Sequence, residues 1–290
     1  MKVSFTADPL SDWQELVRFP FMVHALWAGA VVAVLSAAVG WYMVVRRQAF
    51  AGHTLSVMAF PGAAGAGLAG LPPAWGFYVA AGVAAVAMGG SGGAGRSARL
   101  ETALIGTVQA VGLAGGFLFL ALSDQLLSGP ETLLFGTFLG ITGGQVVGLA
   151  AVAAACLIAL AVLGRPLLFA SIDPEGARAG GLPVGALDLA FMVILGLTVA
   201  ATSQITGALL VFALLVAPSA CAQVITPRPL AGLMLSVVLG LAIAWASLAL
   251  AYFTIYPVGF YVTSLGFGLY VIARASRAAH TRLHSAPRGG

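Results

Sequence analysis

The stretch that decides the fold class lies at residues 206–226 and reads TGALLVFALLVAPSACAQVIT. It contains no charged residue over a length that suits one helical crossing, because a hydrocarbon core of about 30 Å takes about 20 helical residues. The rest of the chain is similar: 60% of its 290 residues are hydrophobic, 8% are charged, and the mean hydropathy is +1.03. The strands of a membrane barrel would instead alternate polar and apolar residues over about 10 positions. The sequence therefore predicts an all-α, polytopic membrane protein.

Nine apolar segments have the length that one crossing needs. A further region, ETLLFGTFLGIT at 131–142, indicates a short extra or re-entrant helix, and LPP at 71–73 is the only break between two of the segments. We therefore expect about nine transmembrane helices, with eight or ten as alternatives. The nine segments are 20–45, 52–70, 74–95, 101–123, 143–164, 184–201, 205–225, 229–254 and 257–274.

The positions of the cations predict the orientation in the membrane, because short cytoplasmic loops collect Lys and Arg. With nine crossings, an N-terminus outside and a C-terminus in the cytoplasm, every Lys and Arg except Lys2 and Arg18 falls on the cytoplasmic side. We therefore expect this orientation. This arrangement also accounts for the formal net charge of +4, so the basic composition does not require a nucleic-acid partner.

The chain divides into one transmembrane domain with a short segment at each end. Residues 1–19 include three acidic residues and lack the basic start and apolar run of a cleaved signal peptide, so we interpret them as an extracytoplasmic or interfacial segment. Residues 20–275 form the transmembrane domain, and residues 276–290 form a basic cytoplasmic tail.

The longest polar interruption of the domain, residues 167–183, falls on the predicted cytoplasmic side. Asp173 can cap a helix, Pro174 suits the first helical position, and Gly180 with Gly181 can end that helix after about two turns. A short, capped, charged helix between two crossings is suited to docking a cytoplasmic partner. The alternative is an ordinary solvated turn.

The sequence contains little that indicates a catalytic site. GGSG at 89–92 is similar to the Gly-x-Ser-Gly of rhomboid-type proteases, but the only downstream histidines, His280 and His284, lie in the charged tail, which disfavours a buried catalytic pair. The only lysine is Lys2, so the chain has no Walker A loop. We therefore predict a protein that is not an enzyme and whose ATPase, if transport uses ATP, is another polypeptide.

Four stretches carry a resemblance to a known family: LLFASIDPEGARAGGLPVG (167–185), the stretch at 206–226, RRQAFAGHTLSVMAFPGAAGAGLAG (46–70) and LLFGTFLGIT (133–142). Together they resemble the permease subunits of bacterial ABC importers for zinc, manganese and iron, over residues 20–275. The resemblance implies a permease of the bacterial cytoplasmic membrane that has no covalently bound cofactor. Its cargo would be a divalent metal ion, moved by alternating access while a partner subunit uses ATP.

The same resemblance implies the partners. Two permease chains, identical or related, would pair within the lipid, and an extracytoplasmic solute-binding protein would deliver the metal. Two cytoplasmic ATPase subunits would bind the coupling segment 167–183 through four of its residues. Pro61 and Pro218 would serve as gating positions, since each removes a helical hydrogen bond within a crossing. The four coupling residues are Asp173, Pro174, Glu175 and Arg178.

Members of this family resemble G-D-A-L-S-H-A-x-x-P-G where this chain reads GHTLSVMAFPG, residues 52–62. An Asp and a His four residues apart share one helical face and suit a borderline divalent cation. In this chain His53 occupies the first position and Val57 the second, so one ligand has changed type and the other is missing. The candidate metal-pathway residues are His53, Ser56 and Asp188.

Several alternatives stay open at this point. His53 could be structural, hydrogen-bonded to Ser56 or Gln48, and Asp188 could be a helix cap or the partner of an arginine. The cargo could be a larger chelate of the siderophore or cobalamin type, which needs a wider and less polar path. An ion-coupled secondary transporter would need carboxylates in the middle of the membrane, and the sequence offers essentially none there.

Overall fold

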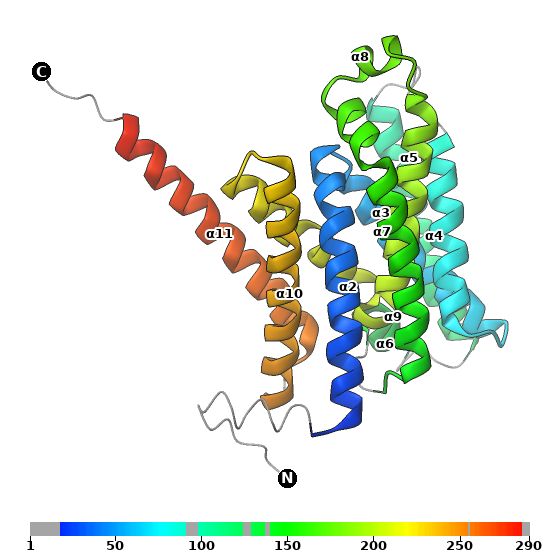
Figure 1. The fold of residues 1–290 in the computed structure, drawn as a ribbon. Helices are drawn as coiled ribbons and strands as arrows, with labels where there is room; N and C mark the ends of the chain where they lie inside the picture. The colour runs from blue at the N-terminus through cyan, green and yellow to red at the C-terminus, as the bar shows by residue number, and fades with distance from the viewer. Residues whose placement is uncertain (1–17, 91–97, 124–128, 137–139, 255, 286–290) are drawn as a thin grey trace, which may run out of the picture.

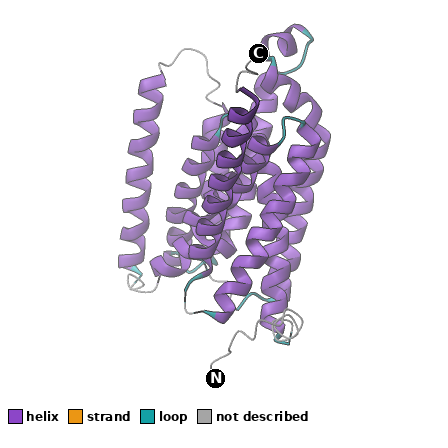
Figure 2. Ribbon diagram, turned by 90° about the vertical axis from the view of Figure 1, so that its left-hand side faces the viewer, coloured by secondary structure: helices purple, strands orange, loops and turns teal. Residues whose placement is uncertain are grey.

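The computed structural model describes residues 18–90, 98–123, 129–136, 140–254 and 256–285. Every regular element in these ranges is a helix, which confirms the predicted all-α class (Figure 2). The helices are α2 (Pro20–Val45), α3 (Ala49–Leu68), α4 (Pro73–Gly90), α5 (Ala98–Leu122), α6 (Gly129–Phe135), α7 (Gly143–Ile172), α8 (Pro174–Ala179), α9 (Val184–Ile225), α10 (Pro229–Phe253) and α11 (Val258–Ser285).

Most of the long helices lie side by side in one bundle, with the short helix α8 at one end of it, whereas α11 slants away from the bundle toward its C-terminal end (Figure 1). Helix α2 is central and packs against α7, α9 and α10. In an apolar 18-residue window of α2, 72% of the residues are buried, whereas in the window of α5 only 11% are buried. The interior of the bundle is therefore built around α2, and α5 lies at its edge.

Small residues allow the helices to approach closely. A Cβ atom added to Gly76 on α4 would lie 2.1 Å from the carbonyl oxygen of Gly62 on α3. A Cβ atom on Gly40 of α2 would lie 2.0 Å from the carbonyl oxygen of Leu215 on α9. In lipid, where burial from water does not drive helix association, such backbone contact contributes much of the packing.

Helix α9 is 42 residues long and is broken at Gly207, which has φ 75° and ψ 158°. A straight helix of that length would measure about 63 Å, roughly twice the thickness of a hydrocarbon core. The break turns the chain back. Asp188 near the start of α9 pairs with Arg46 at the end of α2, and Gln223 near the end of α9 donates to the carbonyl of Trp41. The two legs of α9 therefore both reach the C-terminal part of α2.

The predicted interruption between residues 201 and 205 is wrong, because these residues are helical and the break falls at Gly207. Two of their polar side chains find partners without leaving the helix: Thr202 bonds to Ser36 of α2 at 3.0 Å, and Gln204 donates to the carbonyl of Ala200 at 3.3 Å. The buried hydroxyl of Ser203 has no partner among the described residues. A glycine tolerates positive φ at no steric cost, so the chain turns at Gly207 instead.

Seven of the described helices are long and apolar enough to cross a membrane: α2, α4, α5, α7, α9, α10 and α11. Helix α3 is not among them, and α9 is counted once although Gly207 divides it. The count of nine crossings and the orientation of the two termini therefore stay predictions. Helix α6 lies where a short extra helix is predicted, and residues 137–139 of that region are outside the described residues.

Two helices run further than predicted. Helix α7 continues past residue 164 to Ile172, and α11 continues past residue 274 to Ser285. Pro166 inside α7 removes a single hydrogen bond, and the apolar residues after it keep the helix going. The helix ends at Asp173, because Pro174 pushes the preceding residue out of the helical region, to φ −136° and ψ 85°. The first six residues of the predicted coupling segment are therefore helical. Residues 1–17 and 286–290 of the two terminal segments are outside the described residues.

Candidate functional site

His53 lies in the second turn of α3, and its half-buried side chain faces the second leg of α9. Its ring meets the ring of Phe212 edge to face, with 5.2 Å between the centroids and 65° between the planes. Among the described residues His53 has no hydrogen-bond partner, so Ser56 and Gln48 do not hold it. Neither imidazole nitrogen is therefore held by a described residue, and Val57 follows one turn later on the same face.

Ser56 is fully buried and ties α3 to α9. Its hydroxyl donates to the carbonyl of Ala208 at 2.7 Å, directly after the break at Gly207. A break leaves the last carbonyls of the first leg without helical donors, whereas Ala208 begins the second leg, so the Ser56 bond attaches α3 to the start of that leg. Ser56 supplies one donor and keeps acceptor capacity on its oxygen.

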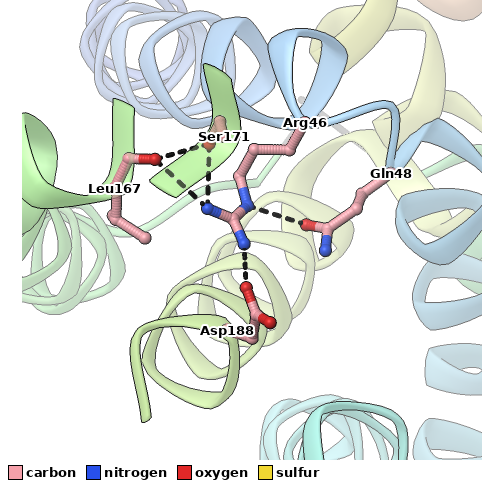
Figure 3. A network of polar contacts seen from close by, with 5 residues as sticks. All are labelled: Arg46, Gln48, Leu167, Ser171 and Asp188. Atoms are coloured by element: carbon pink, nitrogen blue, oxygen red, sulfur yellow. Dashed lines mark hydrogen bonds and ion pairs between the residues drawn. The ribbon is translucent and has the colours of Figure 1, made fainter. Parts of the chain in front are cut away.

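Asp188 lies in the second turn of α9, and its half-exposed carboxylate pairs with the guanidinium of Arg46. Arg46 also donates from Nε to Gln48 at 3.3 Å, and from one terminal nitrogen to Ser171 at 3.0 Å and to the carbonyl of Leu167 at 3.4 Å (Figure 3). We call Arg46, Gln48, Leu167, Ser171 and Asp188 the Arg46 cluster. It joins α2, the N-cap of α3, the end of α7 and the start of α9.

The structure does not bring the three candidate pathway residues into one ligand set. His53 contacts Phe212, Ser56 contacts Ala208, and Asp188 contacts Arg46. Within the described part of the chain, no group of three or more His, Cys, Asp or Glu side chains could hold a metal ion. A metal bound at His53 would therefore need ligands from backbone, from water or from another chain.

The coupling segment has the predicted helix punctuation. The carboxylate of Asp173 accepts from the backbone N–H of Gly176 at 2.8 Å, Pro174 is the first residue of α8, and Gly181 has φ 80° just beyond its end. Glu175 lies in the first turn and Arg178 in the last, where each charge complements the helix dipole. The structure thus presents a capped, charged helix of one to two turns at the end of the bundle (Figure 1).

The two predicted gating prolines lie inside helices that carry the candidate pathway residues. Pro61 is in α3, two turns after His53, and it has no N–H to donate to the carbonyl of Val57. Pro218 is in the second leg of α9 and likewise cannot donate to the carbonyl of Leu214. Each helix therefore has a weakened turn, and their gating role stays a prediction.

Sequence reasoning missed Arg46 as an organising residue and Phe212 as the neighbour of His53. Arg46 directly follows an apolar segment, which suggested only a cytoplasmic charge. One signal could have identified Arg46: a cation at the end of one predicted crossing can pair with Asp188, a carboxylate just inside the same end of another crossing. Nothing local marks Phe212, because it is one apolar residue among many in the 206–226 stretch.

An all-helical bundle with seven helices long and apolar enough to cross a membrane, among the described residues, identifies this chain as a multi-pass membrane protein. The chain belongs to the ABC 3 transport family, whose sequence pattern matches residues 18–277. It is a protein of the bacterial inner membrane, and the family consists of permease subunits of ABC transporters, which are not themselves the ATPases.

Relatives and solved structures agree with this assignment. The chain is 31% identical over 219 residues to the chelated iron transport system membrane protein YfeC of Yersinia pestis, which covers 74% of this chain and 73% of that protein. It is 26% identical over 239 residues to the manganese transport system membrane protein MntC of Halalkalibacterium halodurans, covering 81% and 80% of the two chains.

Among solved structures, the chain is similar to PsaBC from Streptococcus pneumoniae in complex with Fab, with a TM-score of 0.80, 25% identity and coverage of 91% and 94%. It shares its fold with a metal-chelate type ABC transporter solved in an inward-facing conformation, with a TM-score of 0.63 and 16% identity. The predicted metal-importer permease fold is thereby confirmed.

Proposed function

We propose that this chain is the permease of an ATP-driven importer of divalent metal ions, with manganese, zinc or iron as cargo. The observation that carries the proposal is His53, a half-buried imidazole with no hydrogen-bond partner among the described residues, in a helix weakened by Pro61. An ionisable side chain inside a membrane domain is by default a functional candidate. Imidazole suits Zn and Fe better than Mg or Ca.

A second permease chain, identical or related, would complete the site. In a two-fold dimer each patch is presented twice, so two copies of His53 could approach across the axis. Ser56 and the carbonyl of Val57, which Pro61 leaves without a helical donor, lie within one turn of His53 and offer oxygen atoms to the same path. Lipid would surround the pair.

The remaining partners would act at the two ends of the bundle. At the cytoplasmic end, an ATPase subunit would dock on α8 through Asp173, Pro174, Glu175 and Arg178. At the other end, an extracytoplasmic binding protein would deliver the metal. ATP binding and hydrolysis would move α8, and the helices bent at Pro61 and Pro218 would open the path first to one side and then to the other.

The test is metal uptake by vesicles that carry the permease with its ATPase and binding protein, measured for Mn, Zn and Fe. We expect His53→Ala to lower uptake of the cargo metal about tenfold or more, since loss of a supporting group alone costs metal sites about 10- to 100-fold. His24→Ala is the matched control: it removes another half-buried imidazole, one whose ring nitrogen is bonded to the carbonyl of Ile141 at 3.1 Å.

A gain-of-function variant strengthens the test. Val57→His places a second imidazole one turn from His53, and we expect it to lower the metal concentration for half-maximal uptake. Basal ATPase activity and co-purification of the subunits confirm that each complex assembles. Unchanged uptake of all three metals in His53→Ala would contradict the proposal that His53 touches the cargo.

A permease for a metal chelate is the second candidate. An apolar Val57 beside His53 fits a larger and less polar cargo, and two of the similar proteins are named for chelated iron or a metal chelate. The same vesicles distinguish the two functions. Uptake of chelated iron that is insensitive to His53→Ala, without uptake of the free ions, supports the chelate and excludes the free metal.

A further inference from the structure

Two residues of the Arg46 cluster flank α8 in the sequence. Ser171 lies two residues before Asp173, the cap of α8, and Asp188 lies nine residues after Ala179, the end of α8. Both side chains contact the same guanidinium (Figure 3). A displacement of α8 must therefore also move the segments before and after it, which Arg46 holds together.

The other side of the cluster leads to His53. Arg46 is the C-cap of α2, Gln48 is the N-cap of α3, and Arg47 is the single residue between them. Two backbone bonds close this turn, from Gln48 to the Met43 carbonyl at 2.9 Å and from Arg47 to the Val44 carbonyl at 3.0 Å. The connection between α2 and α3 is therefore short and hydrogen-bonded. The bond from Arg46 Nε to Gln48 also ties the guanidinium directly to the N-cap of α3.

The two charges of the ion pair differ in exposure. The Arg46 side chain is 6% exposed and the Asp188 side chain is 40% exposed. The guanidinium also lies over the ring of Phe191, 5.0 Å from its centroid, so it stays held when the carboxylate leaves. Asp188 can exchange the guanidinium for water, because its carboxylate already reaches solvent. The buried Arg46 would then keep its bonds to Gln48, Ser171 and the Leu167 carbonyl. The pair is therefore a contact that can break and re-form while Arg46 keeps its place.

We propose that Arg46 is a positioning residue that couples movement of α8 to α3, and so to the His53 region, with Asp188 as the releasable partner. This inference rests on the proposed function, in which α8 receives the ATPase. It assigns Asp188 to coupling and not to the metal. A planar fork of donors suits this task, because one guanidinium can bond to several elements at once and a lysine ammonium cannot reproduce that geometry.

The experiment uses the assembled complex with Cys156 and Cys221 replaced by alanine, so that one introduced cysteine reports at a time. Ile172→Cys reports beside α8 and Phe50→Cys reports on the first turn of α3; both positions are exposed. Maleimide labelling rates are compared with and without ATP and vanadate. With the cluster intact, we expect both rates to change.

Asp188→Asn keeps the size of the side chain and removes its charge. We expect the change at position 172 to persist, the change at position 50 to disappear, and uptake per ATP hydrolysed to fall about fivefold or more. Arg46→Lys should do the same. Arg165→Gln is the control: it removes an exposed cation from the same part of α7 outside the cluster and should leave both responses and the coupling ratio unchanged.

Three results would overturn the inference. Persistence of the response at position 50 in Asp188→Asn, with an unchanged coupling ratio, shows that α3 does not depend on the pair. A raised KM for metal with unchanged coupling assigns Asp188 to the cargo instead. Lack of response at both positions in the intact complex removes the docking role of α8, and with it the premise of this inference, while metal uptake still tests the transport function separately.

Discussion

Gly207→Ala should destabilise the protein strongly, because the break in α9 leaves no room for a side chain. A Cβ atom at position 207 would lie 2.3 Å from the backbone nitrogen of Gly136 and 2.4 Å from the carbonyl oxygen of Leu134. Both are backbone atoms of the segment that contains α6, so they cannot turn aside as a flexible side chain would. The backbone at φ 75° and ψ 158° is also unfavourable for any residue with a Cβ atom.

The two costs can be estimated separately. A residue held in a sparsely populated backbone region costs about 1–3 kcal/mol. Overpacking by one methyl group in a tight interior costs about 1–3 kcal/mol more. The sum, about 2–6 kcal/mol, is a large part of the roughly 5–15 kcal/mol that stabilises a typical protein.

Two control variants separate the costs. Gly140→Ala also has a positive φ, of 94°, but no atom of the described residues lies within 4 Å of its added Cβ atom, so we expect only the backbone cost of about 1–3 kcal/mol. Gly148→Ala lies in helix α7 with open space around it, and we expect no loss, or a gain of up to about 1 kcal/mol from helix propensity.

Thermal unfolding of the purified protein in detergent checks the order. Cys156 and Cys221 are both buried, so the rate at which a thiol-reactive dye labels them reports unfolding. The expected midpoint temperature of unfolding is highest for Gly148→Ala, lower for Gly140→Ala and lowest for Gly207→Ala. A midpoint for Gly207→Ala equal to that of Gly140→Ala would refute the argument from close backbone contact.

Two further predictions concern hydroxyl and carboxyl groups. Ser236→Ala should cost about 0.6–1.7 kcal/mol, because the hydroxyl donates to the Ala37 carbonyl at 3.0 Å and pairs with Ser219; Ser247→Ala on the same helix should cost nothing, since that buried hydroxyl has no partner among the described residues, and the dye-labelling assay compares them. Asp173→Ala should weaken α8 by about 1 kcal/mol through loss of its cap, so hydrogen exchange at residues 176–179 should quicken while exchange in α10 stays unchanged. Equal protection of residues 176–179 in the wild type and in Asp173→Ala would argue against the cap.

Local signals made α8 and most membrane helices predictable. Asp173, Pro174 and Gly181 act within a few residues of one another, so their capping and terminating roles can be read directly from the sequence. Apolar runs of about 20 residues likewise predict crossings wherever they occur. The break at Gly207 was harder to place, because polar residues before it suggested a loop and instead bond within the membrane domain.

Contacts between distant segments account for what the sequence did not predict. Arg46 and Asp188 are separated by 142 positions, and their pairing depends on how α2, α7 and α9 meet. His53 and Phe212 meet only because α9 turns back at Gly207. Neither composition nor periodicity carries such information, so these contacts could be found only from the packed bundle.

The divided α9 also bears on how the chain enters the membrane during synthesis. No charged residue lies between Asp188 and Arg228, so the insertion machinery meets one stretch without charge. The predicted topology puts the flanking cations Arg178 and Arg228 on the same side of the membrane. Such a stretch is too long for one straight crossing, and the break at Gly207 suits entry as a hairpin whose legs enter lipid together. The buried tip at Gly207 would then form early, before α10 and α11 leave the ribosome, and a newly made chain that lacked this glycine would be exposed to quality control from that moment.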